Sequence, residues 1–309
     1  MPVKTKIVVI AGPTCAGKSA IGAENALRFN GEIISADSMQ VYREMDIGTA
    51  KPDRAALNAV KHHLIDVVNP TEAYDAERFR RDAADAIDEI QGRSKNAFIV
   101  GGTGLYILAL TQGLVEGLPT DLKLRAELGK TATACGRVAL HERLKTIDPA
   151  SALAIHPNNI AQVTRAIEIS IIAGRPASAL RAEHAFSNDR YATLKIGVTP
   201  ERDALYGAID ARVDAMISNG LVDEVERLIS GGYSRDLKPM RSLGYKEVVG
   251  FLDGAYSLDE AVRLIKRNTR HYAKRQLTWF KRDPDLLWFD PSAESDRDGI
   301  KKCIEDFLT

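Results

Sequence analysis

Residues Lys6–Ser19, KIVVIAGPTCAGKS, give the strongest indication of the fold of this chain. Its first half is apolar and ends in glycine, as a buried strand does, and the amphipathic segment Ser19–Phe29 predicts a helix. The turn between them, Gly12–Ser19, matches the pattern GxxxxGK followed by Ser or Thr at every fixed position. Because the motif stands between a strand and a helix, we interpret it as a P-loop rather than a chance match in an ordinary turn.

The chemistry of this loop indicates a di- or triphosphate ligand. Its glycines allow backbone N–H groups to point at an anion, and the helix that follows adds its positive N-terminal end. Lys18 adds a full positive charge, and the Ser19 hydroxyl is a candidate ligand for Mg²⁺. We interpret Cys15 as an incidental loop residue. The predicted phosphate-binding residues are Gly12, Pro13, Thr14, Cys15, Ala16, Gly17, Lys18 and Ser19.

Further apolar runs alternate with helical patterns at both ends of the chain. The expected strands are Glu32–Ser35, Ala97–Val100, Thr193–Val198 and Leu286–Phe289, and long helices are expected at about 201–231 and 258–282. Apolar strands that alternate with helices are typical of a parallel sheet covered on both faces. The expected fold class is therefore α/β, a P-loop NTPase-like sheet flanked by helices, and the polar stretch Pro291–Asp298 is expected to be a loop.

The pattern becomes purely helical in the middle of the chain. Helical segments at Leu122–Leu128, Arg137–Thr146 and Asn159–Ala173 are separated by Asp-Pro, His-Pro and Gly-Arg-Pro breaks. We interpret this region as an inserted helical subdomain within a core built from both ends of the chain. The expected domains are 1–116 and 191–309 for the core and 117–190 for the insert.

Composition excludes several classes of protein. Lys and Arg total 42, equal to Asp and Glu, so any nucleic-acid surface must be a local patch. The three cysteines are too few and too dispersed for a disulfide framework or a zinc site. His62 and His63 lack the spacing of a ligand pair and are expected to be structural. Because the N-terminal apolar run is too short to span a bilayer, we expect a cytoplasmic protein.

Several further motifs resemble those of the tRNA dimethylallyltransferase family, also called tRNA isopentenyltransferases. They are Asp37–Tyr42 (DSMQVY), Asp46–Pro52 (DIGTAKP), Ile99–Tyr106 (IVGGTGLY), Arg241–Lys246 (RSLGYK) and Arg275–Phe280 (RQLTWF). The resemblance covers nearly the whole chain. It implies transfer of a dimethylallyl group from dimethylallyl diphosphate, held by the P-loop, to the exocyclic amino group of the adenosine immediately 3′ of the anticodon, forming N6-isopentenyladenosine. Mg²⁺ is the expected cofactor and the tRNA anticodon stem-loop the expected partner of a monomer that engages no membrane.

This reaction needs cations around the departing diphosphate and a base near the attacking amine. The resemblance assigns Asp37, which follows a strand, as the base, Arg212 as a diphosphate contact and Thr103 as a position near the acceptor base. Asp37 as a Mg²⁺ ligand or a helix cap remains an alternative, because sequence cannot separate these roles. The alternatives for Arg212 and Thr103 are a solvated helix charge and a helix cap.

The resemblance also implies contacts with tRNA, whose target base must be turned out of the stacked anticodon loop. The matching residues are Asp37, Ser38, Met39, Gln40, Thr103, Arg125, Ala161, Gln162, Val163, Thr164, Arg165, Arg241, Ser242, Leu243, Gly244, Tyr245 and Lys246. This chain departs from the family at Ala161–Gln162, where the pattern often has Gln-Arg. That departure leaves the contact through Gln162 open.

The helix expected at 263–282 carries eight basic residues and no acidic residue before Asp283. Its apolar residues recur at helical spacing, so that one face packs and another is basic. We expect this unbalanced charge to contact the RNA backbone in a salt-sensitive manner, with ordinary solvated surface as the alternative.

Other functions remain possible from sequence alone. An adenylate isopentenyltransferase performs the same chemistry on free AMP, ADP or ATP but needs no surface for a folded RNA. A P-loop kinase of small metabolites would bind ATP in the loop and turn it over. An RNA-binding protein with a vestigial P-loop would bind tRNA without catalysis. Assays with tRNA, AMP and ATP separate these readings.

Overall fold

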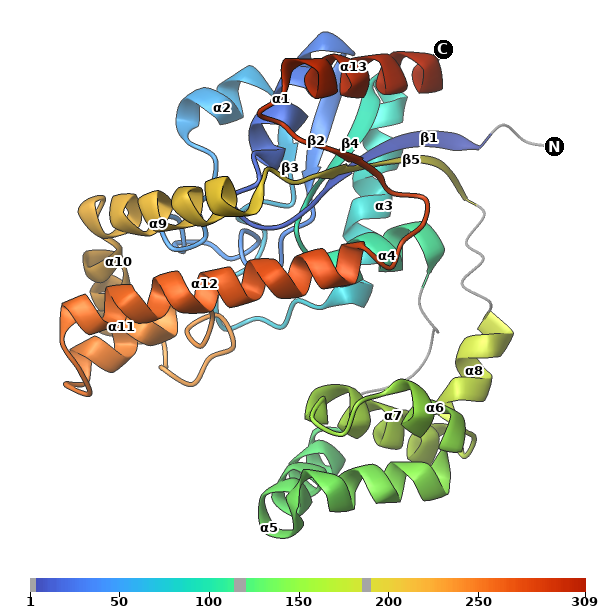
Figure 1. The fold of residues 1–309 in the computed structure, drawn as a ribbon, viewed down its shortest axis with the longest axis vertical. Helices are drawn as coiled ribbons and strands as arrows, with labels where there is room; N and C mark the ends of the chain where they lie inside the picture. The colour runs from blue at the N-terminus through green and yellow to red at the C-terminus, as the bar shows by residue number, and fades with distance from the viewer. Residues whose placement is uncertain (1–3, 114–120, 185–189) are drawn as a thin grey trace. The chain divides into compact units, whose positions relative to one another are not determined.

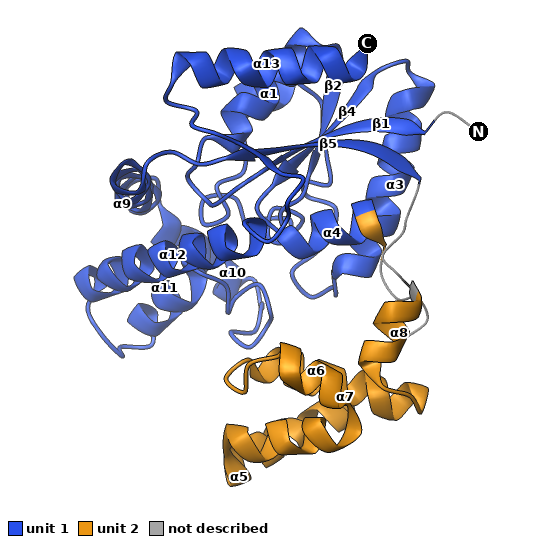
Figure 2. Cartoon of the chain, turned by 45° about the vertical axis from the view of Figure 1, so that its right-hand side comes forward, with its two compact units in different colours: residues 1–111, 189–309 blue, residues 112–188 orange. Residues whose placement is uncertain are grey.

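The computed structural model describes residues 4–113, 121–184 and 190–309. It divides into two compact units: unit 1 comprises 1–111 and 189–309, and unit 2 comprises 112–188 (Figure 2). The expected boundary between 116 and 117 lies outside the described residues. None of the described helices combines the length and the apolar character that a bilayer crossing requires.

Unit 1 is built on a six-stranded sheet in the order β3-β2-β4-β1-β5-β6, and every pairing in it is parallel. The strands are β1 (Thr5–Ala11), β2 (Gly31–Ser35), β3 (His62–His63), β4 (Asn96–Gly101), β5 (Tyr191–Val198) and β6 (Leu287–Phe289). β1 lies between β4 and β5, with Val9 opposite Ile99 on one side and Lys195 on the other. The expected parallel α/β sheet is confirmed.

Helices cover both faces of this sheet, as Figure 1 shows. Those of unit 1 are α1 (Lys18–Arg28), α2 (Arg54–Ala59), α3 (Ala76–Gly92), α4 (Gly104–Gln112), α9 (Arg202–Ser218), α10 (Leu221–Ser230), α11 (Tyr245–Leu252), α12 (Leu258–Phe280) and α13 (Glu294–Leu308). α1 and α13 pack on one face, and α3 packs on β2 and β4 from the other. α9 and α12 pack on each other beside the phosphate loop.

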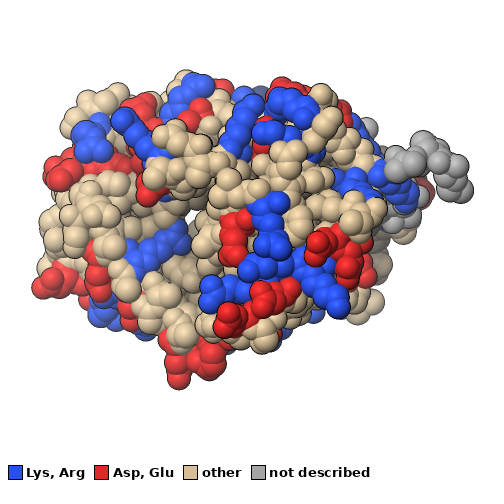
Figure 3. All heavy atoms as spheres, turned by 90° about the horizontal axis from the view of Figure 1, so that it is seen from above, with Lys and Arg blue, Asp and Glu red and all other residues tan. Residues whose placement is uncertain are grey.

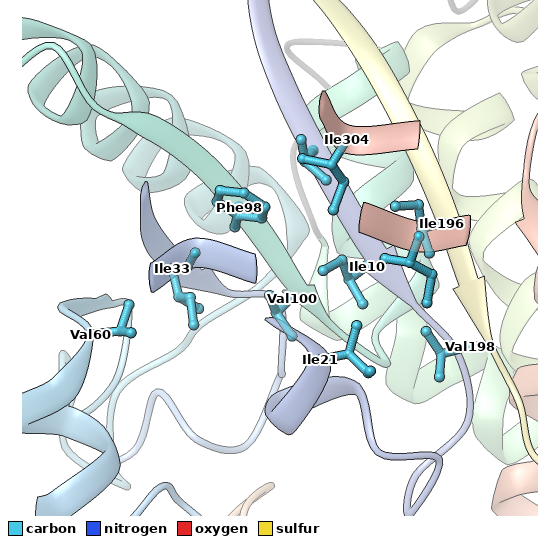
Figure 4. Close-up of a cluster of buried hydrophobic side chains, with 12 residues drawn as sticks. Ile10, Ile21, Ile33, Val60, Phe98, Val100, Ile196, Val198 and Ile304 are labelled. Atoms are coloured by element: carbon cyan, nitrogen blue, oxygen red, sulfur yellow. The ribbon is translucent and has the colours of Figure 1, made fainter. Parts of the chain in front are cut away.

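The core on the α1 side joins the sheet to two helices that are far apart in sequence. Ile10 and Ile196 from the central strands meet Ile21 of α1 and Ile304 of α13 in one buried cluster (Figure 4). Full burial of such a side chain contributes about 1.5–3 kcal/mol. The start of α1, which carries the phosphate loop, is therefore anchored by both ends of the chain.

The prediction of a loop at Pro291–Asp298 is wrong in its second half, because α13 begins at Glu294. The acidic residues that suggested solvent-exposed loop lie in the first turn of the helix, where they face its positive end. The helix is held by Ile300 and Ile304, which are four residues apart and fully buried against the sheet. The predicted helix at 201–231 is likewise two helices, since Gly220 at a φ of 93° begins α10.

Unit 2 is entirely helical in its described part. Its helices are α5 (Leu122–Ile147), α6 (Pro149–Ala154), α7 (Ile160–Ala173) and α8 (Ala177–His184). The two segments predicted at 122–128 and 137–146 form one element that kinks at Gly136. The Asp-Pro break is a helix start, since the Asp148 carboxylate caps α6 and also accepts from the Ser178 N–H at 2.8 Å. That buried carboxylate binds two helix ends together.

Candidate active site

The phosphate loop has the backbone that its glycines predict. Gly12 has a φ of 149°, and a Cβ there would overlap the Val198 carbonyl of β5. Gly17 has a left-handed φ of 82° and begins α1. Ala16 packs into a buried cluster with residues of α9 and α12. The loop is therefore held by β5 from one side and by two distant helices from another.

Lys18 lies folded back on this loop, and its ammonium group donates to the Pro13 carbonyl at 2.6 Å. Burial lowers the pKa of Lys18 to about 8; the nearby Asp37 charge opposes this shift and Arg212 adds to it. A buried ammonium group is costly without an anion. The site thus favours a ligand that brings negative charge to Lys18.

Arg212 reaches the loop from α9, 198 residues further along the chain than its partner. Its Nη1 donates to the Thr14 hydroxyl at 3.1 Å and to the Cys15 sulfur at 3.5 Å. The structure therefore brings together two cations, Lys18 and Arg212, at the loop. An exposed helix charge, the alternative for Arg212, does not describe this position.

Asp37 stands at the carboxyl edge of the sheet, two residues after β2. Its Oδ1 accepts from the backbone N–H groups of Met39 at 2.8 Å and Gln40 at 3.3 Å. Within the described ranges, no group donates a hydrogen bond to its Oδ2. One oxygen of Asp37 therefore orders the following turn, while the other remains for a substrate or a metal.

Thr103 supports the same turn from the next strand. Its Oγ1 accepts from the Ser38 N–H at 3.1 Å, and its own N–H donates to the Ala36 carbonyl at 3.1 Å. The Thr103 carbonyl accepts the first bond of α4, from Ile107. Thr103 thus precedes the first residue of α4 and connects the turn after β2 to the turn after β4. It does not line the pocket described next.

A pocket of about 490 Å³ in unit 1 connects the loop to the Asp37 turn. Its charged and hydroxyl lining includes Thr14, Lys18, Ser19, Asp37 and Arg212. Its apolar lining includes Ile209, Val213, Met216, Leu243 and Ile265. One cavity therefore combines cations, a carboxylate and an apolar wall, so the molecules bound in it would meet all three.

Only some of the predicted tRNA contacts near Gln40 and in 241–246 lie in the pocket. Ser38, Met39, Gln40, Ser242, Leu243, Gly244 and Lys246 line the pocket, and Arg241 does not. Gln40 is already engaged, because its Nε2 donates to the carbonyls of Thr49 and Ala50 and its Oε1 accepts from Ser35. Tyr245 is fully buried and donates its hydroxyl to Glu224 at 2.5 Å. Tyr245 therefore packs inside unit 1, and a contact of the 241–246 stretch with tRNA would be made by its neighbours.

Unit 2 carries the other predicted contacts. Glu168 of α7, which is fully buried, accepts from Arg125 Nε at 2.9 Å and from Arg165 Nη1 at 2.6 Å. Both guanidinium groups remain partly exposed. Val163 is 1% exposed and packs in the core of the unit, so its side chain does not fit the predicted contact. Ala161 and Gln162 are exposed and Thr164 is half-buried.

The basic helix 263–282 is less unbalanced than its sequence indicates. Arg263 pairs with Glu260 at 2.6 Å, Lys266 with Asp214 at 2.6 Å, and Arg270 with Asp210. Asp210 and Asp214 belong to α9, which sequence could not place beside α12. On the face that Figure 3 shows, Lys and Arg lie interspersed with Asp and Glu. The prediction that these cations lack counter-charges is wrong for three of them.

Two residues that hold the loops of the site were not predicted from the sequence. Gln276 of α12 accepts from the Thr14 N–H at 2.8 Å and donates to the Gly102 carbonyl at 2.9 Å, so it joins the phosphate loop to the end of β4. Glu224 of α10 accepts from the backbone of the 46–48 loop. Gln276 lies in the RQLTWF motif, and its position in a shared motif was the available hint.

Known proteins share this architecture and these motifs. Residues 40–283 match the family model described as IPP transferase. The chain is 50% identical over 287 residues to tRNA dimethylallyltransferase 2 of Geotalea uraniireducens, covering 93% of each chain. It is 47% identical over 308 residues to the tRNA dimethylallyltransferase of Desulfatibacillum aliphaticivorans, covering 100% of both.

Two solved structures are also similar. The tRNA isopentenylpyrophosphate transferase of Bacillus halodurans superposes with a TM-score of 0.74 at 42% identity, covering 99% of this chain and 97% of that one. A eukaryotic dimethylallyltransferase that acts on tRNA superposes with a TM-score of 0.81 at 27% identity, covering 98% of this chain and 79% of its own. The similarity extends through both the sheet unit and the helical unit.

Proposed function

This chain belongs to the IPP transferase family and is an enzyme that transfers a dimethylallyl group to tRNA, and we propose how its pocket does so. The proposed donor is dimethylallyl diphosphate, and the proposed acceptor is the exocyclic amino group of the adenosine immediately 3′ of the anticodon. The observation that carries this proposal is one pocket with Lys18 and Arg212 at one end, Asp37 beside them and an apolar wall from α9. The product is N6-isopentenyladenosine.

The donor would lie with its diphosphate in the loop and its five-carbon tail against the apolar wall. Breaking the allylic C–O bond leaves the bonding electrons on the diphosphate, where Lys18 and Arg212 stabilise the negative charge. The tail is apolar, and Ile209, Val213 and Met216 form an apolar surface against which it can pack. These side chains would not attack the cationic carbon in place of the adenine amine. The same wall reduces access of water to that carbon.

The adenine amine would attack the allylic carbon with its nitrogen lone pair and lose one proton. The Oδ2 of Asp37 is the group that would take this proton, because Oδ1 is held by the Met39 and Gln40 N–H groups. One N–C bond forms, one C–O bond breaks, and the proton passes to the carboxylate. General-base catalysis of this kind contributes about 10²- to 10⁴-fold in rate.

The side chains present fit a magnesium ion. The Ser19 hydroxyl and the Asp37 carboxylate both line the pocket and would hold the ion, since Mg²⁺ prefers oxygen ligands. When bound, the ion would add positive charge to the departing diphosphate. Asp37 as base and Asp37 as metal ligand both remain proposals for the same carboxylate.

The tRNA would be recognised by both units, each through its own residues. In unit 1 these are the Asp37–Gln40 turn and the pocket-lining residues of 242–246; in unit 2 they are Arg125, Gln162 and Arg165. We propose that the enzyme acts in the cytoplasm as a monomer.

The test of this proposal measures which acceptor gains a prenyl group. The purified protein is incubated with dimethylallyl diphosphate and Mg²⁺, together with either an unmodified tRNA carrying adenosine beside its anticodon or free AMP, and the mass of each acceptor is measured by mass spectrometry. A separate incubation with ATP and Mg²⁺ measures ATP turnover. A mass gain on the tRNA alone supports the proposal. A gain on AMP alone would indicate an adenylate isopentenyltransferase, and a gain on neither, with ATP turned over, would indicate a kinase.

A further inference from the structure

Glu224 is a buried carboxylate in unit 1 that the transfer chemistry does not use. It lies on α10 and is 1% exposed. Its Oε2 accepts from the N–H groups of Asp46 at 3.0 Å and Ile47 at 2.8 Å, and its Oε1 accepts from Gly48 N–H at 3.1 Å. The fourth donor is the Tyr245 hydroxyl, also to Oε1, at 2.5 Å. Four donors satisfy this charge, and three belong to consecutive residues of one loop.

The loop held by Glu224 forms part of the pocket wall. Gly48 and Thr49 line the pocket, and a Cβ on Gly48 would overlap the ring of Tyr245. The far side of the loop is fixed by Lys51, whose ammonium group donates to the Tyr42 carbonyl at 2.6 Å and pairs with Asp46 at 2.6 Å. Glu224 and Lys51 therefore clamp this loop from two sides.

The same loop sets the orientation of Gln40. The carbonyls of Thr49 and Ala50 accept from Gln40 Nε2 at 3.3 and 3.1 Å, which occupies both of its N–H bonds. The Oε1 accepts from Ser35 at 3.0 Å and keeps one further lone pair. Gln40 lines the pocket and follows the Asp37 turn. Its remaining acceptor therefore has a direction that depends on the loop.

We propose that Glu224 is a positioning residue for the acceptor side of the active site: by holding the 46–48 backbone it orients Gln40 beside Asp37 for the adenine. The inference rests on the proposed function, because it requires adenine of tRNA as the acceptor. The donor side does not depend on Glu224, since the phosphate loop is held by β5, Gln276 and Arg212. Loss of Glu224 should therefore impair the use of tRNA and leave the binding of dimethylallyl diphosphate unchanged.

The experiment compares the steady-state constants of Glu224→Gln with those of the wild-type enzyme for tRNA and for dimethylallyl diphosphate separately. Gln offers one acceptor oxygen where two are used, and its NH₂ group faces backbone donors, so the loop must shift. A displacement of about 1 Å costs up to about 100-fold in rate, and we expect kcat/KM for tRNA to fall toward that value. The KM for dimethylallyl diphosphate should remain that of the wild type.

Glu226→Gln is the matched control, because Glu226 lies on the same helix with its side chain exposed. It should leave both substrates unaffected. The constants are expressed per donor-binding site, counted by titration with dimethylallyl diphosphate, because a residue with a merely structural role would lower only the number of such sites. A raised KM for dimethylallyl diphosphate, or an unchanged kcat/KM for tRNA per donor-binding site, would overturn the proposal.

If Glu224→Gln does not fold, Tyr245→Phe decides the question. It removes one donor to Glu224 and leaves the three backbone bonds, so it should lower kcat/KM for tRNA less strongly and leave the donor KM unchanged. An unchanged value for tRNA would then overturn the proposal. A wild-type enzyme that prenylates no tRNA would instead overturn the proposed function itself, and this inference with it.

Discussion

The phosphate end of the pocket and the helical unit hold their cations in opposite ways. Lys18 is partly buried and donates to a backbone carbonyl, and Arg212 contacts a hydroxyl and a sulfur. Arg125 and Arg165 of unit 2 instead share one buried carboxylate, Glu168. A cation without a carboxylate partner keeps its full positive charge for the ligand and therefore binds a diphosphate strongly. A cation paired with a carboxylate has a fixed orientation, but the carboxylate neutralises its charge. The first arrangement suits chemistry and the second suits recognition.

The largest expected effect tests whether the phosphate end performs the chemistry. Asp37→Asn keeps an oxygen for the Met39 and Gln40 N–H groups but cannot take a proton, so we expect prenyl transfer to fall about 10²- to 10⁴-fold. Single-turnover transfer and tRNA binding are measured together, and binding should persist. Asp53→Asn, at an exposed helix cap, is the control. Preserved turnover would remove Asp37 as the base.

The lowered pKa of Lys18 predicts a pH dependence that the exposed arginines lack. Its pKa is about 8 without ligand, and a bound diphosphate raises it, so binding above pH 8 takes up a proton. Affinity for dimethylallyl diphosphate should therefore be constant between about pH 7 and 8 and fall by up to about tenfold per pH unit above that. Calorimetric titration in buffers of different ionisation enthalpy measures the proton uptake. Affinity that is constant from pH 7 to 9.5 would contradict a buried, ligand-charged Lys18.

Glu168→Gln tests whether direction matters more than charge in the helical unit. The substitution leaves both arginines charged but weakens the contacts that align them, and we expect the Kd for tRNA to rise about tenfold. The salt dependence of binding should be retained, because no cation is lost. Glu183→Gln, which breaks the exposed pair with Arg175 in the same unit, is the control. Tighter binding by Glu168→Gln would mean that Glu168 only reduces the positive potential.

The smallest expected effect separates paired from unpaired cations on α12. Arg267 and Lys274 are exposed, and neither forms a salt bridge with any residue in the described part of the chain. Their joint replacement by Ala should weaken tRNA binding a few-fold and reduce the salt slope by about 2. Replacement of Arg263 and Lys266, which are paired, should change the slope less. A salt slope equal to that of the wild type in both double variants would assign the whole face to plain surface.

Local patterns were sufficient for the elements whose signal is short in sequence. The strand, turn and helix of 6–29 could be predicted because apolar periodicity, glycine geometry and a fixed motif occur within a few turns of chain. The loop at 291–298 could not, since its helix is stabilised by the burial of Ile300 and Ile304 against strands that sequence does not place beside it. The burial of Val163 was missed for the same reason.

The phosphate loop, the parallel sheet and the helical insert could all be predicted from the sequence alone, because each has a local motif or a periodic pattern. Only the tertiary structure decided how the functional side chains are held: Arg212 on Thr14, Gln276 between two loops, Glu224 under the 46–48 backbone and Glu168 between two arginines. Each of these bonds joins residues 40 or more positions apart, with the exception of Arg165–Glu168. Such bonds leave no periodicity in sequence, because a buried polar group needs a partner in space and not at a fixed spacing along the chain.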